Sequence, residues 1–451
     1  MDALLLSRIQ FALTVGFHFL FPPLTIGLAW LLFIVETRAW RTADPAWDEM
    51  GKLFGKLFAL TFAVGVATGI LMEFQFGTNW SRYSKFVGDI FGAPLAAEGV
   101  FAFFLESTFL GLYLFGRNRV PKGVHWFSML MVAVGATISA FWIIVANSWQ
   151  QTPAGYAIRN GRAELTGFWE AVFNPSTLPR YTHTILACLI AGAFLMAAVG
   201  AYRLLRDRED EIGRRAIRLA VPWGLVASVL VAFPFGHWHA QQVAETQPEK
   251  FAAMEGLYTS TTGAPLVLFG LVKQDPPQLN AEIEIPGLLS WLAFGDPGAP
   301  VRGIEEFPED NRPPLWTTFV SFHNMVILGL LFIGLMAWGS WRIWRGTIFE
   351  GRTYLRLLIL AVPLPLIATQ FGWVAAEVGR QPWIVYGMLR TEDAWSPSLG
   401  GGEVLFSILL FGTIYLFLGT LWVRFMVREA GHGLPATVSP RGPREGVARW
   451  T

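Results

Sequence analysis

The sequence predicts an all-α integral membrane protein with nine transmembrane helices, an N-terminus outside and a C-terminus in the cytoplasm. Hydrophobic residues make up 53% of the 451 residues and charged residues only 15%, so a compact soluble fold would lack the polar side chains needed to cover its surface. Several apolar runs exceed the roughly 18 residues that identify a membrane span. Finally, Lys and Arg are concentrated in alternate loops, the asymmetry that sets the orientation of membrane proteins.

Each predicted span is an apolar run close to the roughly 20 residues needed to cross the hydrocarbon core. Charged or turn-forming residues bound each run. In chain order, the nine spans are predicted at 10–36, 54–79, 92–116, 124–149, 182–204, 217–237, 316–341, 354–378 and 402–427.

The basic loops follow the first, third, fifth and seventh spans, and the segment after the ninth is basic as well. The positive-inside rule therefore predicts that these loops are cytoplasmic. The opening "MDALLLSRIQ" has no basic leader or small-residue cleavage site, so the first apolar segment is expected to remain as a helix. The single Cys188 excludes an intrachain disulfide and argues against cysteine-ligated metal centres in this chain.

Four segments follow from these spans: helices one to six at 1–237, an extracytoplasmic loop at 238–315, helices seven to nine at 316–428, and a cytoplasmic tail at 429–451. Within the loop, "QPEKFAAMEGLYTS" predicts a short amphipathic helix. The stretches "KQDPPQLNAEIEIPG" and "EEFPEDNRPP" are rich in Pro and acidic residues, so they are interpreted as irregular loop.

Ionisable side chains within the spans are the best candidates for functional residues. Inserting each of them at membrane depth costs roughly 2.5–3.5 kcal/mol, so such residues are rare unless they have a function. With the predicted orientation, His18, Glu98, His183 and Glu377 lie in the outer half of the membrane, together with the thioether of Met325. A layer of His, Glu and Met beneath a large outer loop suggests buried cofactors that serve a substrate arriving from outside. Iron porphyrins suit such a layer because the macrocycle is apolar and the iron accepts these side chains axially.

Simpler interpretations remain open for each of these residues. His18 is equally compatible with a hydrogen bond to a neighbouring helix, and His183 with an interfacial histidine. Met325 taken alone is most often a packing residue. Glu377 and Arg380 are spaced as an i,i+3 ion pair at a helix end.

Glu106 is harder to explain as an interfacial acid because it lies deep in the third span. It follows Glu98 by eight residues, which places the two carboxylates within about 80° of each other around a regular helix. Ser107, Thr108 and, on the fourth span, Ser139 are candidate hydrogen-bonding companions. This arrangement suits a proton relay from the cytoplasm.

Taken together, several stretches resemble subunit I of the cytochrome bd-type quinol oxidases, over nearly the whole chain. They are "LSRIQFALTVGFHFLFPPLTIGLA", "GVATGILMEFQFGTNW", "APLAAEGVFAFFLESTFLGLYLFG", "SAFWIIVANSWQQTPAGY", "QPEKFAAMEG", "SFHNMV" and "GWVAAEVGRQPW". The resemblance implies nine helices, an outside N-terminus and a quinol-binding loop of the shorter variant between helices six and seven. It also implies a second membrane subunit, small single-span accessory subunits and a bacterial or archaeal cytoplasmic membrane.

The resemblance further implies three haems: a low-spin b-type haem, a high-spin b-type haem and a third that is haem d or b. By position, His183 and Met325 would ligate the low-spin haem, and His18 and Glu377 the two high-spin haems. Glu98 would be a ligand or proton donor at the oxygen-reducing haem, with Glu106 on the proton path. The other implied site residues are Trp373 near the haems, Arg380 beside the propionates or the buried carboxylate, and Lys250 and Glu255 in quinol oxidation.

One residue departs from the family pattern, since His323 stands where an arginine is expected two residues before the methionine ligand. The change puts the potential of the low-spin haem in doubt and offers an alternative ligand. The expected activity is quinol oxidation coupled to reduction of oxygen to water, with charge separated without a pump. Two other functions stay open: a quinol-linked haem subunit with another electron acceptor, and a haem-free proton or ion transporter that uses Glu98 and Glu106.

Overall fold

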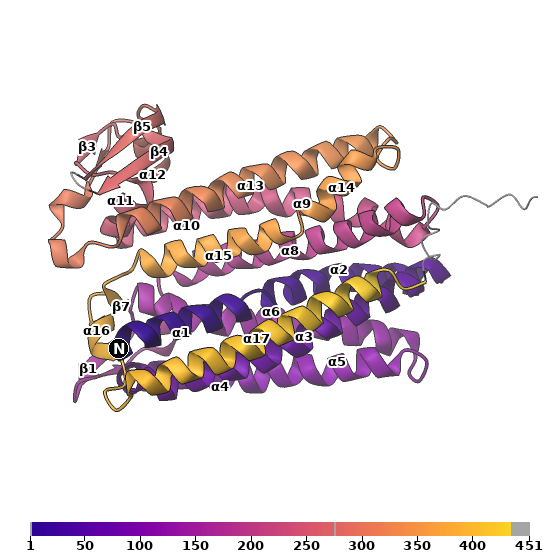
Figure 1. Cartoon of the computed structure of the whole chain (residues 1–451), viewed down its shortest axis with the longest axis horizontal. Helices are drawn as coiled ribbons and strands as arrows, with labels where there is room; N and C mark the ends of the chain where they lie inside the picture. The colour runs from indigo at the N-terminus through magenta and orange to yellow at the C-terminus, as the bar shows by residue number, and fades with distance from the viewer. Residues whose placement is uncertain (1, 275–276, 434–451) are drawn as a thin grey trace, which may run out of the picture.

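The computed structural model describes residues 2–274 and 277–433. Within these ranges, nine helical spans are long and apolar enough to cross a membrane, as predicted. They lie side by side along the long axis of the molecule (Figure 1). Their bounds are Ala3–Thr42, Pro45–Thr78, Ser81–Gly116, Lys122–Gln151, Thr177–Arg206, Glu211–Thr246, Glu309–Trp344, Arg352–Val378 and Gly401–Ala430.

Most of these spans extend beyond the predicted apolar runs. The third begins at Ser81 rather than 92, and the fifth at Thr177 rather than 182. Hydropathy detects the part of a helix that matches hydrocarbon, whereas polar turns continue the same helix beyond it. Glu98 and His183 consequently lie well inside their helices and not at the starts that the sequence predicted.

Proline interrupts three of the spans. The second part of each begins with Pro, whose ring removes a backbone donor and favours a first-turn position. The segments are α1 (Ala3–His18) and α2 (Pro22–Thr42) in the first span, α9 (Glu211–Ala232) and α10 (Pro234–Thr246) in the sixth, and α14 (Arg352–Leu360) and α15 (Pro363–Val378) in the eighth. The first break follows His18 directly.

The third span contains a wide helical turn in its middle. It consists of α4 (Ser81–Ala97), the π-helix η1 (Glu98–Phe103) and α5 (Phe104–Gly116). A π-turn inside an α-helix is rare and frequently marks a functional site. Here it begins at Glu98, one of the predicted site residues.

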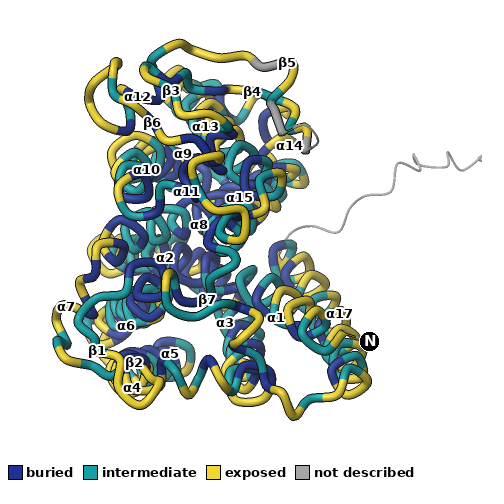
Figure 2. The backbone as a smooth tube through the Cα atoms, turned by 90° about the vertical axis from the view of Figure 1, so that its left-hand side faces the viewer, coloured by how far each residue is buried: buried dark blue, intermediate teal, exposed yellow. Residues whose placement is uncertain are grey.

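The core of the bundle lies between α2, α8 (Thr177–Arg206) and α9, where the buried residues gather (Figure 2). Gly27 on α2 and Gly192 on α8 allow these two helices to touch. A Cβ atom at Gly27 would lie 2.0 Å from the carbonyl oxygen of Cys188, and one at Gly192 would lie 2.3 Å from the carbonyl carbon of Gly27. Small residues allow such close backbone approach inside a membrane. The other long helices are α3 (Pro45–Thr78), α6 (Lys122–Gln151), α13 (Leu315–Trp344) and α17 (Gly401–Ala430).

Short strands and helices gather at the end of the bundle that carries the N-terminus (Figure 1). Asn160 and Gly161 both have positive φ and join β1 (Tyr156–Arg159) to β2 (Arg162–Leu165), as expected for a tight two-residue hairpin. The remaining elements at this end before and after the long loop are α7 (Phe168–Val172), β7 (Trp383–Val385), β8 (Leu389–Arg390) and α16 (Thr391–Ala394).

The segment predicted as the outer loop is more ordered than the sequence suggested. The predicted short helix is present as α11 (Pro248–Glu255), but it is buried around its circumference and not amphipathic. The prediction of irregular loop over "KQDPPQLNAEIEIPG" was wrong, because β4 (Leu266–Gln274) pairs antiparallel with β5 (Pro277–Ile285). The alternation of apolar and acidic residues near Ile283 is the strand signal that the prolines concealed. The segment also contains β3 (Thr261–Thr262), α12 (Leu288–Phe294), β6 (Pro300–Val301), η2 (Ile304–Glu306) and η3 (Glu309–Asn311).

The predicted tail at 429–451 largely falls at 434–451, outside the described residues. Helix α17 reaches Ala430, two residues past the predicted boundary at 428. The orientation of the bundle and its division into segments remain predictions. The fold adds that α11 and the strands lie at the opposite end from α14 (Figure 1).

Candidate functional site

The carboxylate of Glu377 forms the centre of a buried polar cluster near the C-terminal end of α15. Its Oε1 accepts hydrogen bonds from Asn147 Nδ2 at 3.1 Å and from Gln151 Nε2 at 3.5 Å, both on α6. Its Oε2 pairs with the guanidinium of Arg380. The predicted i,i+3 ion pair is therefore present, and it is embedded among polar side chains from another helix.

Two buried arginines share this one carboxylate. Arg380 also donates to Gln150 Oε1 at 2.8 Å. Arg180, on the first turns of α8, donates to Asn147 Oδ1 and places its NH2 3.9 Å from Glu377 Oε1. The Nε atoms of both arginines are buried without a hydrogen-bond partner among the described residues. The cluster thus carries more positive than negative charge.

Lys250 connects α11 to this cluster. Its Nζ donates to Gln151 Oε1 at 2.9 Å and to Gln247 Oε1 at 3.2 Å, so Gln151 bridges the amine and the carboxylate of Glu377. Burial, followed by the charge of Arg180, holds the pKa of Lys250 well below its usual value. The side chain packs over Gly379, where a Cβ atom would lie 2.9 Å from Lys250 Cγ.

Glu255 ends the same short helix and is 4% exposed. Its Oε2 has no hydrogen-bond partner among the described residues. Burial raises the pKa of Glu255 to about 8. A carboxyl group with this pKa is largely protonated at neutral pH.

His183 lies next to His239, which the sequence analysis had placed only at the start of the outer loop. The ring centroids of His183 and His239 are 5.5 Å apart. The Nδ1 atom of His183 is buried and has no hydrogen-bond partner among the described residues. Such a nitrogen in a native protein requires an explanation, and a bound group is one.

Met325 and Trp373 lie on facing helices, α13 and α15. The thioether of Met325 lies against Gly372, where a Cβ atom would be 2.9 Å from the sulfur. Gly372 precedes Trp373, whose ring is partly buried. The glycine therefore leaves room for the methionine sulfur beside α15.

His18 lies at the end of α1 and faces α3. Its Nδ1 is 3.0 Å from Thr68 Oγ1, and its ring packs on Gly69, where a Cβ atom would be 3.1 Å from His18 Cε1. A hydrogen bond to one ring nitrogen fixes the ring and leaves the other nitrogen for a ligand. The predicted hydrogen bond to a neighbouring helix is therefore present, and it is compatible with a ligand role.

Glu98 and Glu106 both face α6. Ser139 donates to Glu98 Oε1 at 2.7 Å, a contact that the sequence had proposed. Gly135, one turn away on α6, lies against Glu106. A Cβ atom added at Gly135 would be 3.1 Å from the Cβ atom of Glu106. Because the π-turn lies between the two carboxylates, the angle of about 80° assumed for a regular helix does not apply, but both still face the same neighbour.

The side chain of His323 does not point into the polar cluster around Glu377. Its Nε2 lies 2.9 Å from the carbonyl oxygen of Val267 on β4, its Nδ1 lies 3.1 Å from that of Phe319, and its ring stacks on Phe319 at 3.9 Å. Each ring nitrogen therefore lies within hydrogen-bond distance of a backbone carbonyl, and a neutral ring donates to one of the two. This argues against His323 as the alternative ligand and indicates that it fastens β4 to α13.

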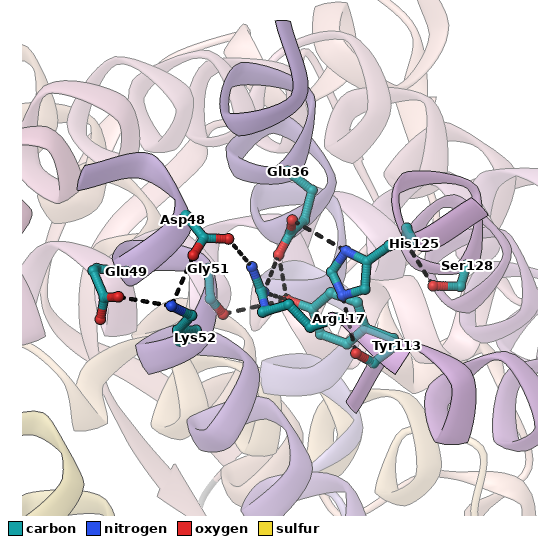
Figure 3. A network of polar contacts seen from close by, with 9 residues as sticks. All are labelled: Glu36, Asp48, Glu49, Gly51, Lys52, Tyr113, Arg117, His125 and Ser128. Atoms are coloured by element: carbon teal, nitrogen blue, oxygen red, sulfur yellow. Dashed lines mark hydrogen bonds and ion pairs between the residues drawn. The ribbon is translucent and has the colours of Figure 1, made fainter. Parts of the chain in front are cut away.

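A second polar network, which the sequence reasoning missed, lies at the opposite end of the bundle (Figure 3). The buried carboxylate of Glu36 accepts from the hydroxyl of Tyr113 at 2.8 Å and pairs with Arg117, and its Oε2 is 3.5 Å from His125 Nδ1. Arg117 also pairs with Asp48 at 2.6 Å. The network joins α2, α3, α5 and α6. An acidic residue inside an apolar run, such as Glu36, was the available signal.

Comparison with known proteins identifies the family of the chain. Residues 6–434 match the family model described as cytochrome bd terminal oxidase subunit I. The chain is 41% identical over 443 residues to cytochrome bd ubiquinol oxidase subunit 1 of Bacillus subtilis, covering 96% of this chain and 94% of the relative. It is 37% identical over 512 residues to cytochrome bd-II ubiquinol oxidase subunit 1 of Escherichia coli, covering 98% and 99%. The structure of bd oxidase from Geobacillus thermodenitrificans superposes with a TM-score of 0.89 at 31% identity, covering 96% of this chain and 99% of that one.

Proposed function

The chain belongs to the cytochrome bd terminal oxidase subunit I family, and from this membership we propose that it carries the haems of a quinol oxidase that reduces oxygen to water. Membership makes it a multi-span protein of a bacterial membrane and a component of a terminal quinol oxidase. The observation that carries the finer proposal is the bridge from Lys250 through Gln151 to Glu377. It links the loop segment directly to the buried polar cluster.

The proposed ligands are the residues that the sequence singled out. His183 and Met325 hold the low-spin b-type haem, and His18 and Glu377 hold the two high-spin haems, the third being haem d or b. Bound haems supply the one-electron chemistry and the oxygen-binding site. The residues present fit such groups because His183 has an orphaned buried nitrogen and His18 is fixed through only one of its two ring nitrogens.

The charge of the cluster supports the same assignment. Arg180 and Arg380 are both buried around one carboxylate, and each has an unsatisfied Nε. Buried charge of one sign is costly unless it is paired. Porphyrins with propionate side chains bring the anionic oxygens that this cluster lacks. Arg380 would then serve both the propionates and Glu377, and Trp373 would contribute to the same haem-binding region.

Lys250 and Glu255 are proposed to bind quinol and to accept its protons. They lie near the two ends of α11 and are both buried, and burial lowers the pKa of Lys250 and raises that of Glu255 to about 8. An unprotonated amine in reach of a quinol hydroxyl can take its proton as the electrons leave, and the carboxyl of Glu255 can accept a proton once it has been ionised. Release of these protons on the outer side would then contribute to charge separation.

Glu98 and Glu106 are proposed to deliver protons from the other side. Glu106 is 6% exposed and lies deeper in the third span, whereas Glu98 is partly exposed and hydrogen-bonded to Ser139. Protons entering from the cytoplasm and protons leaving outside would separate charge without a pump. A second membrane subunit completes the complex, in keeping with the family, and small single-span subunits are also expected.

The direct test is an absorption spectrum of the purified membrane complex. We expect haem bands in the dithionite-reduced minus air-oxidised difference, a shift with carbon monoxide, and extractable pigment that distinguishes haem d from haem b. Haem bands without a carbon monoxide shift would indicate transfer to an acceptor other than oxygen. A folded but colourless complex would overturn the proposal and favour the proton or ion transporter.

The quinol site has a separate test. Lys250→Met and Glu255→Gln should each slow quinol oxidation and leave the haem spectrum unchanged. Glu306→Gln is the matched control in the same loop segment, because the Glu306 side chain is 40% exposed and pairs with Arg302 at 2.7 Å. Full activity in both test variants would refute the role of α11.

A further inference from the structure

An apolar groove lies on α13, α14 and α15, away from the polar cluster. It has a volume of about 580 Å³ and is lined by residues that include Leu331, Gly334, Trp338, Leu357, Leu360 and Leu364. Leu360 is 71% exposed and Leu331 is 48% exposed. A groove of this size is comparable to one long acyl chain and much larger than a packing defect.

The groove follows from the interruption between α14 and α15. Gly334 leaves its centre open, since no atom lies within 4 Å of an added Cβ. Its floor is rigid near Trp338, whose ring meets the ring of Tyr354 edge-on at 5.0 Å, while the Tyr354 hydroxyl donates to the carbonyl oxygen of Leu335 at 3.2 Å. The hollow is therefore built into the packing of these helices.

One end of the groove carries positive charge. Arg345, the residue that directly follows α13, lies seven residues after Trp338, about two helical turns, and Arg356 lies four residues before Leu360 on α14, about one turn. Both therefore continue the groove-lining faces of their helices, and both are exposed. The guanidinium of Arg345 lies 5.8 Å from the ring of Trp341, which is itself 53% exposed.

Some arginines at the same end of the bundle are paired with carboxylates. Arg203 and Arg215 pair with carboxylates at 2.7 and 2.8 Å. Over residues 2–274 and 277–433, no carboxylate lies within 4.0 Å of Arg345 or Arg356. An occupant of the groove must therefore combine a long apolar part with a negative group at one end.

We propose that the groove binds one anionic phospholipid. Its acyl chain lies along Gly334, Leu357 and Leu360, and its phosphate lies against Arg345 and Arg356, with Trp341 at the level of the headgroup. The lipid bridges α13 and α15, the helices that carry Met325 and Glu377. An apolar protein helix would fill the hollow but would leave both guanidinium groups without an anion.

The test measures lipid binding to the purified oxidase complex by native mass spectrometry. Dioleoyl phosphatidylglycerol is compared with zwitterionic dioleoyl phosphatidylcholine. Arg345→Gln combined with Arg356→Gln should weaken binding of the anionic lipid about thirtyfold, since each basic residue near a lipid headgroup contributes roughly a factor of five. Gly334→Trp should remove the same bound lipid while keeping both arginines.

The matched control is Arg38→Gln combined with Arg41→Gln. These two exposed arginines lie at the end of α2, at the same end of the bundle, and do not line this groove. We expect unchanged binding in this control. The proposal would be overturned if the control variant lost as much binding of the anionic lipid as the Arg345 and Arg356 variant, or if the parent complex bound the two lipids equally. A polypeptide that co-purifies with the complex and is lost with Gly334→Trp would also overturn it, because the occupant would then be a protein.

Discussion

Glu377→Gln tests how strongly the single carboxylate of the polar cluster stabilises the two buried arginines beside it. The substitution keeps the shape of the side chain but removes the one carboxylate that Arg180 and Arg380 share. With Arg180 NH2 at 3.9 Å from Glu377 Oε1, the lost attraction is about 4 kcal/mol at an effective dielectric constant of about 20. Breaking a buried pair and leaving its cation uncompensated costs about 3–5 kcal/mol. We therefore expect the free energy of unfolding to fall by that amount.

The assay is unfolding of the purified complex followed by tryptophan fluorescence, with pigment content measured on the same samples. Glu49→Gln is the control, because Glu49 pairs with Lys52 on the surface, where its side chain is 58% exposed, and such pairs contribute at most about 1 kcal/mol. Adding Arg180→Gln to Glu377→Gln should restore part of the loss, since it removes a stranded cation. A loss no larger than that of Glu49→Gln, or strictly additive effects in the double variant, would refute the reasoning.

Three further predictions concern the loop helix, the core and the haem ligands. The raised pKa of Glu255 means that its contribution to stability is present below about pH 4.5 and is lost as pH rises towards 8, by about 1.4 kcal/mol per pH unit. Glu255→Gln should therefore become more stable relative to the parent as pH rises. Lys250→Met should show the opposite trend: its stability relative to the parent is greatest at low pH and falls as pH rises, because the pKa of Lys250 is lowered. A difference in unfolding temperature between variant and parent that does not change with pH would contradict both predictions. Gly192→Leu should prevent assembly of a stable bundle, because even a Cβ atom there lies 2.3 Å from Gly27, and recovery of folded complex at parental yield would disprove the backbone contact. His183→Ala and Met325→Ala should each abolish the low-spin haem signal, and an unchanged spectrum in either variant would remove that residue from the ligand set.

The sequence was sufficient for the number of spans, and it singled out Glu377, Arg380 and Lys250, which meet in the buried polar cluster. Nine apolar runs predicted the nine spans found among the described residues, because the membrane requires each crossing to be apolar and helical. The same requirement made Glu377, His18 and Glu106 conspicuous, since charge or strong polarity inside a span is rare.

Contacts between residues that are far apart in the sequence could not be predicted from the sequence alone. The partnership of Arg180 with Glu377 joins residues 197 positions apart, and neither residue signals the other locally. The hairpin of β4 and β5 was missed because prolines dominated the pattern, and its alternation is short. Glu36 looked like the end of a span, and only its contacts with Tyr113, Arg117 and His125 reveal a buried network.

By itself, the sequence determined the membrane-spanning class, the approximate spans and the family resemblance, because hydropathy and local motifs are properties of contiguous residues. The tertiary structure decided which polar groups meet. It brought Lys250 to Glu377 through Gln151, turned His323 towards β4 and, among the residues that the structure describes, left Arg345 and Arg356 without carboxylate partners near an apolar groove. These outcomes depend on how helices pack against one another, and packing is fixed by the whole set of side chains and not by any single stretch of the chain.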